Sequence, residues 1–123
     1  MIKGYHHLAL ICSGEEAITF YTALGFQEVR RVYRPERDDT IVWMEGYGET
    51  LEIFIDATHP ARPSYPEAMG LRHLAFYVSD IEEEIAKLKA IGYEAEPIRF
   101  DAFTGEKMTF VKDPDGLPIE LHE

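Results

Sequence analysis

The chain has 123 residues, of which 46% are hydrophobic, and this is enough apolar material for one domain with a sizeable core. Its formal net charge of −11 at pH 7 argues against nucleic acid or an anionic membrane as a partner. Cys12 is the only cysteine, so no intramolecular disulfide can form, and no stretch reads as a signal peptide or as a membrane-spanning segment. These features predict a protein of the reducing cytoplasm.

The first half of the chain predicts one helix among four strands. Residues 5–12 form an apolar run that indicates a buried strand, and Ser13 can cap a helix that carries Phe20 and Leu24 at helical spacing. Gly25 is typical of the residue that ends a helix. Three further strands are expected at residues 26–33, 40–45 and 50–56. The predicted order is β-α-β-β-β.

The second half repeats this order after a connector. Residues 57–69 are rich in proline and show no periodicity. The stretch 70–78 then alternates like a strand, and Ser79 or Asp80 can cap a helix that Gly92 ends. The helix is expected over residues 81–91, and the strands after it at 93–98, 107–112 and 117–121.

The two halves match along their whole length. His7-Leu8-Ala9-Leu10 returns 66 positions later as His73-Leu74-Ala75-Phe76, Gly92 follows Gly25 by 67 positions, and Glu120 follows Glu52 by 68. Neither half can bury a sheet face alone, so the repeat predicts two modules built against each other. We expect an α+β fold of tandem βαβββ modules that form a curved mixed sheet, in a single domain over residues 1–123. Module 1 covers about 5–56, the connector 57–69 and module 2 about 70–123.

Two histidines and two glutamates occupy equivalent positions in the halves: His7 with His73, and Glu52 with Glu120. Helices must cover the aliphatic face of each strand, so strand alternation leaves these four side chains on the other face. A lone buried carboxylate is costly, and a bound cation removes that cost. Two imidazoles and two carboxylates suit one divalent ion such as zinc, nickel, cobalt or iron. We predict that the four residues hold such an ion.

Each of these residues also has an ordinary alternative. A strand histidine is more often a core or rim group than a ligand, and a strand glutamate more often faces solvent. His6 competes with His7 but should point to the opposite face, and His59 and His122 are expected to be surface residues. The equivalence of all four positions favours the metal site.

These motifs resemble the vicinal oxygen chelate (VOC) superfamily, the glyoxalase, bleomycin-resistance and dioxygenase group. The resemblance covers nearly the whole chain. It rests on the two histidine strands, on Phe20-Tyr21 through Leu24-Gly25-Phe26, on Leu51-Glu52-Ile53, and on Asp113-Pro114-Asp115-Gly116 leading to Glu120. Within the superfamily, the complete His/Glu/His/Glu set is similar to glyoxalase I (lactoylglutathione lyase). Extradiol dioxygenases use two histidines and one carboxylate.

The resemblance implies a metal-dependent lyase or isomerase that acts on a hemithioacetal or a related α-hydroxycarbonyl compound through a metal-stabilised enediolate. Glu120 would be the catalytic residue that moves a proton between neighbouring carbons, with Glu52 as its structural counterpart. The resemblance also implies one divalent ion (Ni, Zn, Co or Fe), a small-molecule substrate such as a thiol conjugate, and a homodimer. In that dimer His7 and Glu52 of one chain would meet His73 and Glu120 of the other, and the stiff connector favours this exchange.

Two positions depart from glyoxalase I. The resemblance places an arginine for the glutathione carboxylate four residues after the first histidine, and an asparagine four residues after the first glutamate. This chain has Ile11 and Asp56 there, which disfavours glutathione as the thiol. An anionic part of the substrate could instead meet one of several arginines that equally suit solvated strand edges, namely Arg31, Arg34, Arg37 and Arg99.

Two other functions fit the same sequence. The first is another metalloenzyme of the superfamily, such as an acyl-CoA epimerase or a thiol transferase that acts on an epoxide antibiotic. The second is a non-enzymatic binding or resistance protein that holds a small aromatic ligand with Trp43, Phe54, Tyr77 and Phe103. Metal content separates the second from the enzymes, and a panel of substrates separates the first.

Overall fold

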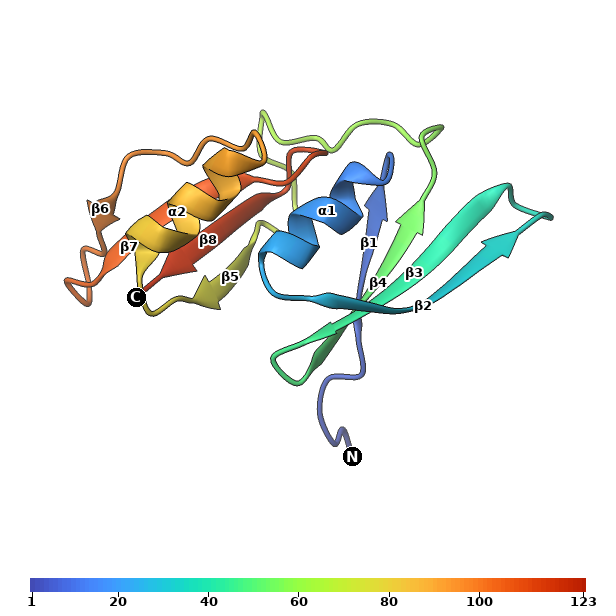
Figure 1. The fold of residues 1–123 in the computed structure, drawn as a ribbon, viewed down its shortest axis with the longest axis horizontal. Helices are drawn as coiled ribbons and strands as arrows, with labels where there is room; N and C mark the ends of the chain where they lie inside the picture. Colours follow the sequence, from blue (N-terminus) through green and yellow to red (C-terminus); the bar gives the residue numbers. More distant parts are fainter. The chain divides into compact units, whose positions relative to one another are not determined.

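Two helices and eight strands follow one another in the order β-α-β-β-β, given twice (Figure 1). The computed structural model describes residues 1–123, and the chain divides into two units, Met1–Pro60 and Ala61–Glu123. Unit 1 contains β1 (Leu8–Cys12), α1 (Glu16–Ala23), β2 (Gln27–Arg34), β3 (Asp39–Gly46) and β4 (Glu49–Ile55). Unit 2 contains β5 (Leu74–Tyr77), α2 (Ile81–Ala90), β6 (Arg99–Phe100), β7 (Lys107–Lys112) and β8 (Pro118–His122).

The sheet of unit 1 has the strand order β1-β4-β3-β2, with β1 parallel to β4 and the other pairs antiparallel. One face of this sheet packs against α1, whose Ala17, Phe20 and Tyr21 are fully buried. The strands add buried aliphatic side chains to this core, namely Leu10, Val42, Met44, Leu51 and Ile53. Since these positions alternate with polar ones along each strand, the opposite face is left for Trp43 and Glu52.

The sheet of unit 2 repeats the arrangement as β5-β8-β7-β6, again with the first pair parallel. Its helix begins at Asp80, whose carboxylate accepts a hydrogen bond from the Glu83 amide at 3.0 Å, so the prediction of Asp80 as a cap is confirmed. The core of this unit consists of apolar side chains from α2, β7 and β8, namely Ile81, Leu88, Val111, Ile119 and Leu121.

The two helices end in the same way, hydrogen bond by hydrogen bond. The amide of Gly25 donates to the carbonyl of Thr22, and the amide of Gly92 donates to that of Lys89, each at 3.0 Å. The next amide reaches one residue further back in both helices, which completes a Schellman motif. Both glycines have positive φ (105° and 95°), a conformation that favours glycine. The predicted equivalence of Gly25 and Gly92 therefore holds at the level of backbone geometry.

The predicted α+β fold of tandem βαβββ modules is confirmed, and each module forms a mixed sheet of its own. Three local predictions are wrong. Residues 93–98 form only an isolated bridge between Ala95 and Val111, and Pro97 lacks the N–H that a longer ladder requires. Ser13 does not cap α1, whose N-cap position is Glu15 without a side-chain hydrogen bond. The first strand of each unit is also shorter than expected: β1 begins at Leu8, one residue after His7, and β5 begins at Leu74, one residue after His73.

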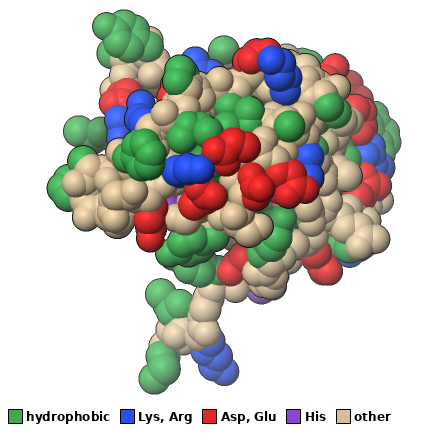
Figure 2. All heavy atoms as spheres, turned by 60° about the vertical axis from the view of Figure 1, so that its left-hand side comes forward, with side chains coloured by type: hydrophobic (Ala, Val, Ile, Leu, Met, Phe, Trp, Pro, Cys, Tyr) green, Lys and Arg blue, Asp and Glu red, His purple; other side chains and the backbone are tan.

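Neither α1 nor α2 has the length and apolar character that crossing a membrane requires. On the face drawn in Figure 2, acidic side chains gather in a band with basic side chains beside them. The first turn of α2 adds three glutamates, Glu82, Glu83 and Glu84, which also favour the positive end of the helix dipole. Basic side chains on this surface therefore have acidic side chains close by.

Candidate metal centre

In unit 1 the structure brings His7 and Glu52 together. Glu52 lies in β4 between the buried residues Leu51 and Ile53, so its side chain emerges on the face away from α1. Parallel pairing sets Ala9 of β1 opposite Glu52, and His7 lies two residues earlier on the same edge. The Nε2 atom of His7 is 3.7 Å from Oε2 of Glu52, and the two side chains are 37% and 19% exposed.

In unit 2 the structure brings His73 and Glu120 together in the same register. Ala75 of β5 lies opposite Glu120 of β8, as Ala9 lies opposite Glu52. The Nε2 atom of His73 is 3.9 Å from Oε2 of Glu120, and the side chains are 26% and 16% exposed. Each unit therefore presents one imidazole and one carboxylate at an equivalent place.

The donor set and spacing of each pair fit a divalent ion. Imidazole nitrogen with carboxylate oxygen suits zinc, nickel, cobalt or iron. Two ligands about 2.1 Å from one ion lie roughly 3.0–3.4 Å apart at octahedral or tetrahedral angles. The separations of 3.7 and 3.9 Å are a few tenths of an ångström wider, which a small side-chain rotation closes. Within either unit no third His, Cys, Asp or Glu is arranged with the pair to hold an ion, so each unit by itself offers two ligands.

The unit 1 pair is fixed by two neighbours. The indole Nε1 of Trp43 donates to Oε2 of Glu52 at 3.0 Å, across the β3–β4 register that sets these residues opposite each other. The Nδ1 atoms of His6 and His7 are 2.8 Å apart, so one ring donates to the other. This contact occupies Nδ1 of His7 and leaves its Nε2 facing Glu52, as in histidine ligands that are oriented through their other ring nitrogen.

The expectation that His6 points to the opposite face is wrong. Its ring meets that of His7 edge-on, with centroids 5.1 Å apart. The regular strand begins only at Leu8, so strand alternation does not apply to the two histidines. His6 thus lies against the ring of His7.

The unit 2 pair lies beside a pocket and an aromatic ring. His73 meets Phe110 edge-on at 5.1 Å between centroids. Both line a pocket of about 670 Å³, together with Arg72, Glu96, Arg99 and Lys112. A smaller pocket of about 300 Å³ is lined by Glu120 and His122. No hydrogen-bond donor holds Glu120 in the way that Trp43 holds Glu52.

His122 is an anchored residue that sequence reasoning treated as an ordinary surface histidine. Its side chain is only 16% exposed, with Nε2 3.1 Å from Oδ2 of Asp101 and Nδ1 3.2 Å from Oε2 of Glu106. The hydrogen bond to Asp101 raises the pKa of His122, and the same bond lowers the pKa of Asp101. The sequence did contain a sign of this role, because His122 lies two residues after Glu120 and so on the same face of the strand.

The arginines named from the sequence are mostly committed to carboxylates. Arg31 binds Glu15 and Glu28. Nε of Arg34 donates to Oδ1 of Asp39 at 2.7 Å. The guanidinium of Arg99 has a looser partner in Glu96, at 3.8 Å. Arg31 and Arg34 therefore belong to structural ion pairs, and their guanidinium groups are not available to bind an anionic substrate.

The two positions that depart from glyoxalase I offer no positively charged side chain. Ile11, four residues after His7, is 58% exposed in β1. Asp56 accepts hydrogen bonds from the amide of Thr58 at 2.9 Å and its hydroxyl at 2.6 Å, and these bonds lower the pKa of Asp56. Its carboxylate therefore closes a turn after β4.

The four aromatic residues considered for ligand binding do not share one environment. Tyr77 and Phe103 are 92% and 97% exposed in unit 2. In unit 1, Trp43 and Phe54 each lie under a guanidinium, that of Arg30 at 5.1 Å and that of Arg34 at 5.3 Å from the ring centroid. Arg30 was not among the arginines that the sequence singled out.

Comparison with known proteins gives consistent results. The family model of the glyoxalase/bleomycin resistance protein/dioxygenase superfamily matches residues 4–121. The uncharacterized protein YwkD of Bacillus subtilis is 43% identical, over 100% of this chain and 98% of YwkD. A lactoylglutathione lyase of Salmonella typhimurium is 30% identical, over 96% of this chain and 90% of the lyase. The crystal structure of a glyoxalase family protein from Enterococcus faecalis has a TM-score of 0.89 and 54% identity, and the match covers 98% of each chain.

Proposed function

Since this chain belongs to the glyoxalase/bleomycin resistance protein/dioxygenase superfamily, we propose that it is a metal-dependent lyase or isomerase acting on a hemithioacetal or a related α-hydroxycarbonyl compound. The observation that carries the proposal is the His/Glu contact that recurs at the same strand register in both units. Similarity to a lactoylglutathione lyase along nearly the whole chain supports it.

His7, Glu52, His73 and Glu120 would hold the ion, which their donor atoms suit as zinc, nickel, cobalt or iron. When bound, the ion supplies Lewis-acid stabilisation of negative charge on vicinal oxygens of the substrate. An imidazole that binds a metal does so in its neutral form, so the two carboxylates would balance the charge of a divalent cation. This balance accounts for glutamates placed between aliphatic residues in β4 and β8.

Glu120 is the residue that would move the proton between neighbouring carbons. Glu52 is held by the Trp43 indole, and such a donor fixes the orientation of the carboxylate. Glu120 has no comparable donor and lines a pocket of about 300 Å³, so its carboxylate is free to rotate toward a substrate. This asymmetry supports Glu120 as the acid–base group and Glu52 as its structural counterpart.

The thiol of the conjugate would differ from glutathione. Ile11 offers no charge on the face beside His7, and the carboxylate of Asp56 is committed to Thr58. A glutathione carboxylate would therefore find no cation at either position. We expect turnover with a smaller or differently charged thiol.

The working protein would be a cytoplasmic homodimer with two shared sites. Each unit offers only two ligands, whereas a stable catalytic site needs at least three. In the dimer, His7 and Glu52 of one chain would meet His73 and Glu120 of a second copy. The connector after β4 contains Pro60, Pro63 and Pro66, whose stiffness favours exchange between chains.

Metal analysis of the purified protein, followed by a methylglyoxal assay with several thiols, tests the activity. We expect one divalent ion per chain after stripping with a chelator and reloading with nickel, zinc, cobalt or iron. The His7→Ala variant should lose the ion, while His59→Ala, which alters a histidine paired with Asp56 at 3.4 Å, should keep it. Wild-type protein that binds no ion would overturn the enzyme and leave a binding protein; metal without methylglyoxal turnover would point to another superfamily reaction.

Mixing two inactive chains tests the shared site. A His7→Ala chain and a Glu120→Ala chain each damage every site of their own homodimer. After subunit exchange, a mixed dimer with shared sites regains one intact site out of two, so random exchange of equal amounts should restore metal to about a quarter of all sites. If verified exchange restores no binding, the site is made within one chain.

A further inference from the structure

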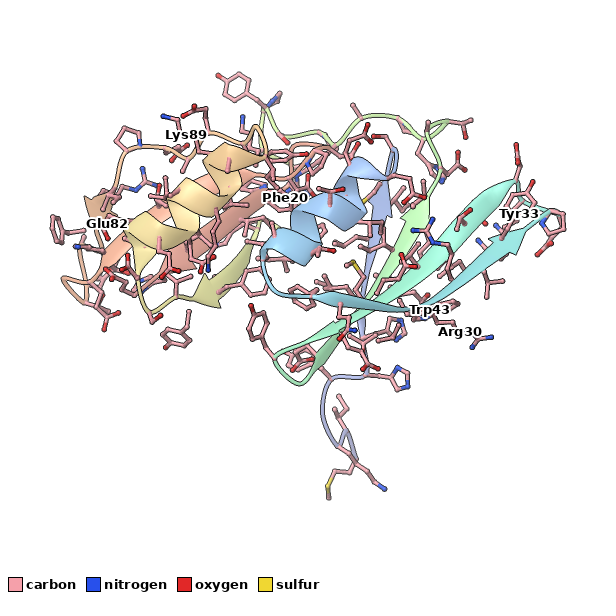
Figure 3. All side chains as sticks on the ribbon, in the orientation of Figure 1. Phe20, Arg30, Tyr33, Trp43, Glu82 and Lys89 are labelled. Carbon is pink, nitrogen blue, oxygen red and sulfur yellow. The ribbon has the colours of Figure 1, made fainter.

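A row of three side chains crosses the metal-facing side of the unit 1 sheet. Register pairs Arg30 of β2 with Trp43 of β3, and Trp43 with Glu52 of β4. The guanidinium carbon of Arg30 lies 5.1 Å from the Trp43 ring centroid, and the Trp43 indole donates to Glu52 at 3.0 Å. Figure 3 shows Arg30 and Trp43 side by side. One aromatic ring thus connects a cation to a proposed metal ligand.

Among the arginines of β2, Arg30 is the one that has no carboxylate partner. Its neighbours along β2 are taken, Arg31 by Glu15 and Glu28, and Arg34 by Asp39. No carboxylate lies within ion-pair distance of Arg30, although the chain carries 23 acidic residues and 12 basic ones. Stacking on an indole orients a guanidinium and leaves the N–H donors at its edge available.

Unit 2 lacks this feature at the equivalent place. There Glu96 lies opposite Phe110, its amide donating to the Phe110 carbonyl at 2.9 Å. Arg99 reaches over Phe110 at 5.3 Å from the centroid, but Glu96 lies 3.8 Å from its guanidinium. The guanidinium over the Phe110 ring therefore has a carboxylate beside it, whereas the guanidinium over the Trp43 ring has none.

The spacing suits a small substrate. Adjacent strands lie about 4.8 Å apart, so the backbone of Arg30 is roughly 10 Å from that of Glu52. A molecule of a few carbon atoms can span this distance with vicinal oxygens at one end and an anionic group at the other. In an acidic protein, an unpaired guanidinium is also the group that would attract such an anion.

We propose that Arg30, held on Trp43, binds a carboxylate or phosphoryl group of the substrate, so that the enzyme acts on an acidic α-hydroxycarbonyl compound or conjugate. This assignment rests on the proposed function, because the vicinal oxygens of the same molecule must meet the His/Glu set. Arg30 contributes orientation and affinity and takes no part in proton transfer.

A matched pair of chelating probes tests this assignment on the zinc-loaded protein. Succinic acid monohydroxamate has two vicinal oxygens and a carboxylate, and its methyl ester has the same length without the charge. Binding is followed by the fluorescence of Trp43, the only tryptophan, and by calorimetry. We expect the acid to bind about tenfold more tightly than the ester, as a charge-assisted bidentate contact at an exposed site provides.

The variants separate Arg30 from general charge. Arg30→Met should abolish the difference between acid and ester and leave the affinity for the ester unchanged. Arg37→Met removes an exposed arginine of the same unit and should keep the difference. Equal affinity of wild-type protein for both probes, or a preference that survives in Arg30→Met, overturns the role of Arg30 alone. Failure of both probes to bind overturns the metal site itself, and the role of Arg30 with it.

Discussion

The two units share a plan and differ at the edges of their sites. Both place a histidine just before the first strand and a glutamate in the last, with 3.7 and 3.9 Å between the nearest atoms. In unit 1 the neighbouring ring is Trp43, which donates to the carboxylate and carries Arg30. In unit 2 it is Phe110, which has no donor to offer and instead meets His73 edge-on.

This difference indicates a division of labour between otherwise equivalent halves. In the proposed site, one ion would need all four of these side chains as ligands. The residues around the pairs differ: Glu52 accepts a hydrogen bond from Trp43, whereas Glu120 has no such donor and lines a pocket. We expect the halves to be equal in metal binding and unequal in catalysis and substrate orientation.

The largest expected effect is on kcat, and it should differ between the two glutamates. At saturating metal, Glu120→Gln should lower kcat by about 10²–10⁴, because an amide cannot carry the proton. Glu52→Gln should lower kcat less, since the side chain it replaces is held by Trp43. Steady-state kinetics with metal content measured on the same samples decides this. Equal losses in kcat would mean that the two carboxylates are interchangeable.

The helices provide the next contrast, because α1 is anchored by aromatic and α2 by aliphatic residues. Phe20 and Leu88 are both fully buried. Truncation to alanine should lower the free energy of unfolding by about 3–5 kcal/mol for Phe20 and about 2–5 kcal/mol for Leu88. Urea denaturation measures both, and Thr22→Ala on the exposed side of α1 should change stability by about 0.5 kcal/mol or less. A small effect of Phe20→Ala would contradict the packing described for unit 1.

A smaller effect tests whether Trp43 orients its ligand. Trp43→Phe keeps an aromatic ring but removes the donor to Glu52, so zinc affinity should fall about tenfold. Phe110→Leu in unit 2 removes a ring that makes no such hydrogen bond and should alter zinc affinity less. Competition with a chromophoric zinc indicator measures both variants. An unchanged affinity in Trp43→Phe would show that the indole only packs.

The smallest effect concerns a structural ion pair of unit 1. The Arg34 guanidinium beside Asp39 lowers the pKa of that carboxyl below its usual 3.8. The pair therefore stabilises the folded state fully above about pH 4, and this stabilisation is lost as the pH falls through the lowered pKa. Asp39→Asn should reduce the urea midpoint at pH 7 and pH 5 by the same amount, and less at pH 3.

The neighbouring residue supplies the control for that experiment. Asp38→Asn removes the same formal charge, but its carboxylate accepts only from the Tyr33 hydroxyl, at 2.7 Å. The variant should show a smaller change in urea midpoint. If the effect of Asp39→Asn stays constant down to pH 3, the ion pair does not contribute to stability.

The sequence by itself determined the repeat, the order of most elements and the equivalence of His7 with His73 and of Glu52 with Glu120. These follow from periodicity, from glycines at helix ends and from fixed offsets between the halves, all of which can be read from the order of residues alone. The strand predicted at residues 93–98 is only an isolated bridge at Ala95, because Pro97 interrupts an otherwise strand-like pattern.

Only the tertiary structure decided which polar groups meet. The row from Arg30 through Trp43 to Glu52 depends on the register of three strands, including a shift between Glu28 and Arg30 that no sequence period reveals. The same holds for His122, whose partners Asp101 and Glu106 come from an adjoining loop. A periodic pattern says which face a side chain takes, whereas its partners are set by how distant segments pack, and in this protein that packing leaves Arg30 free.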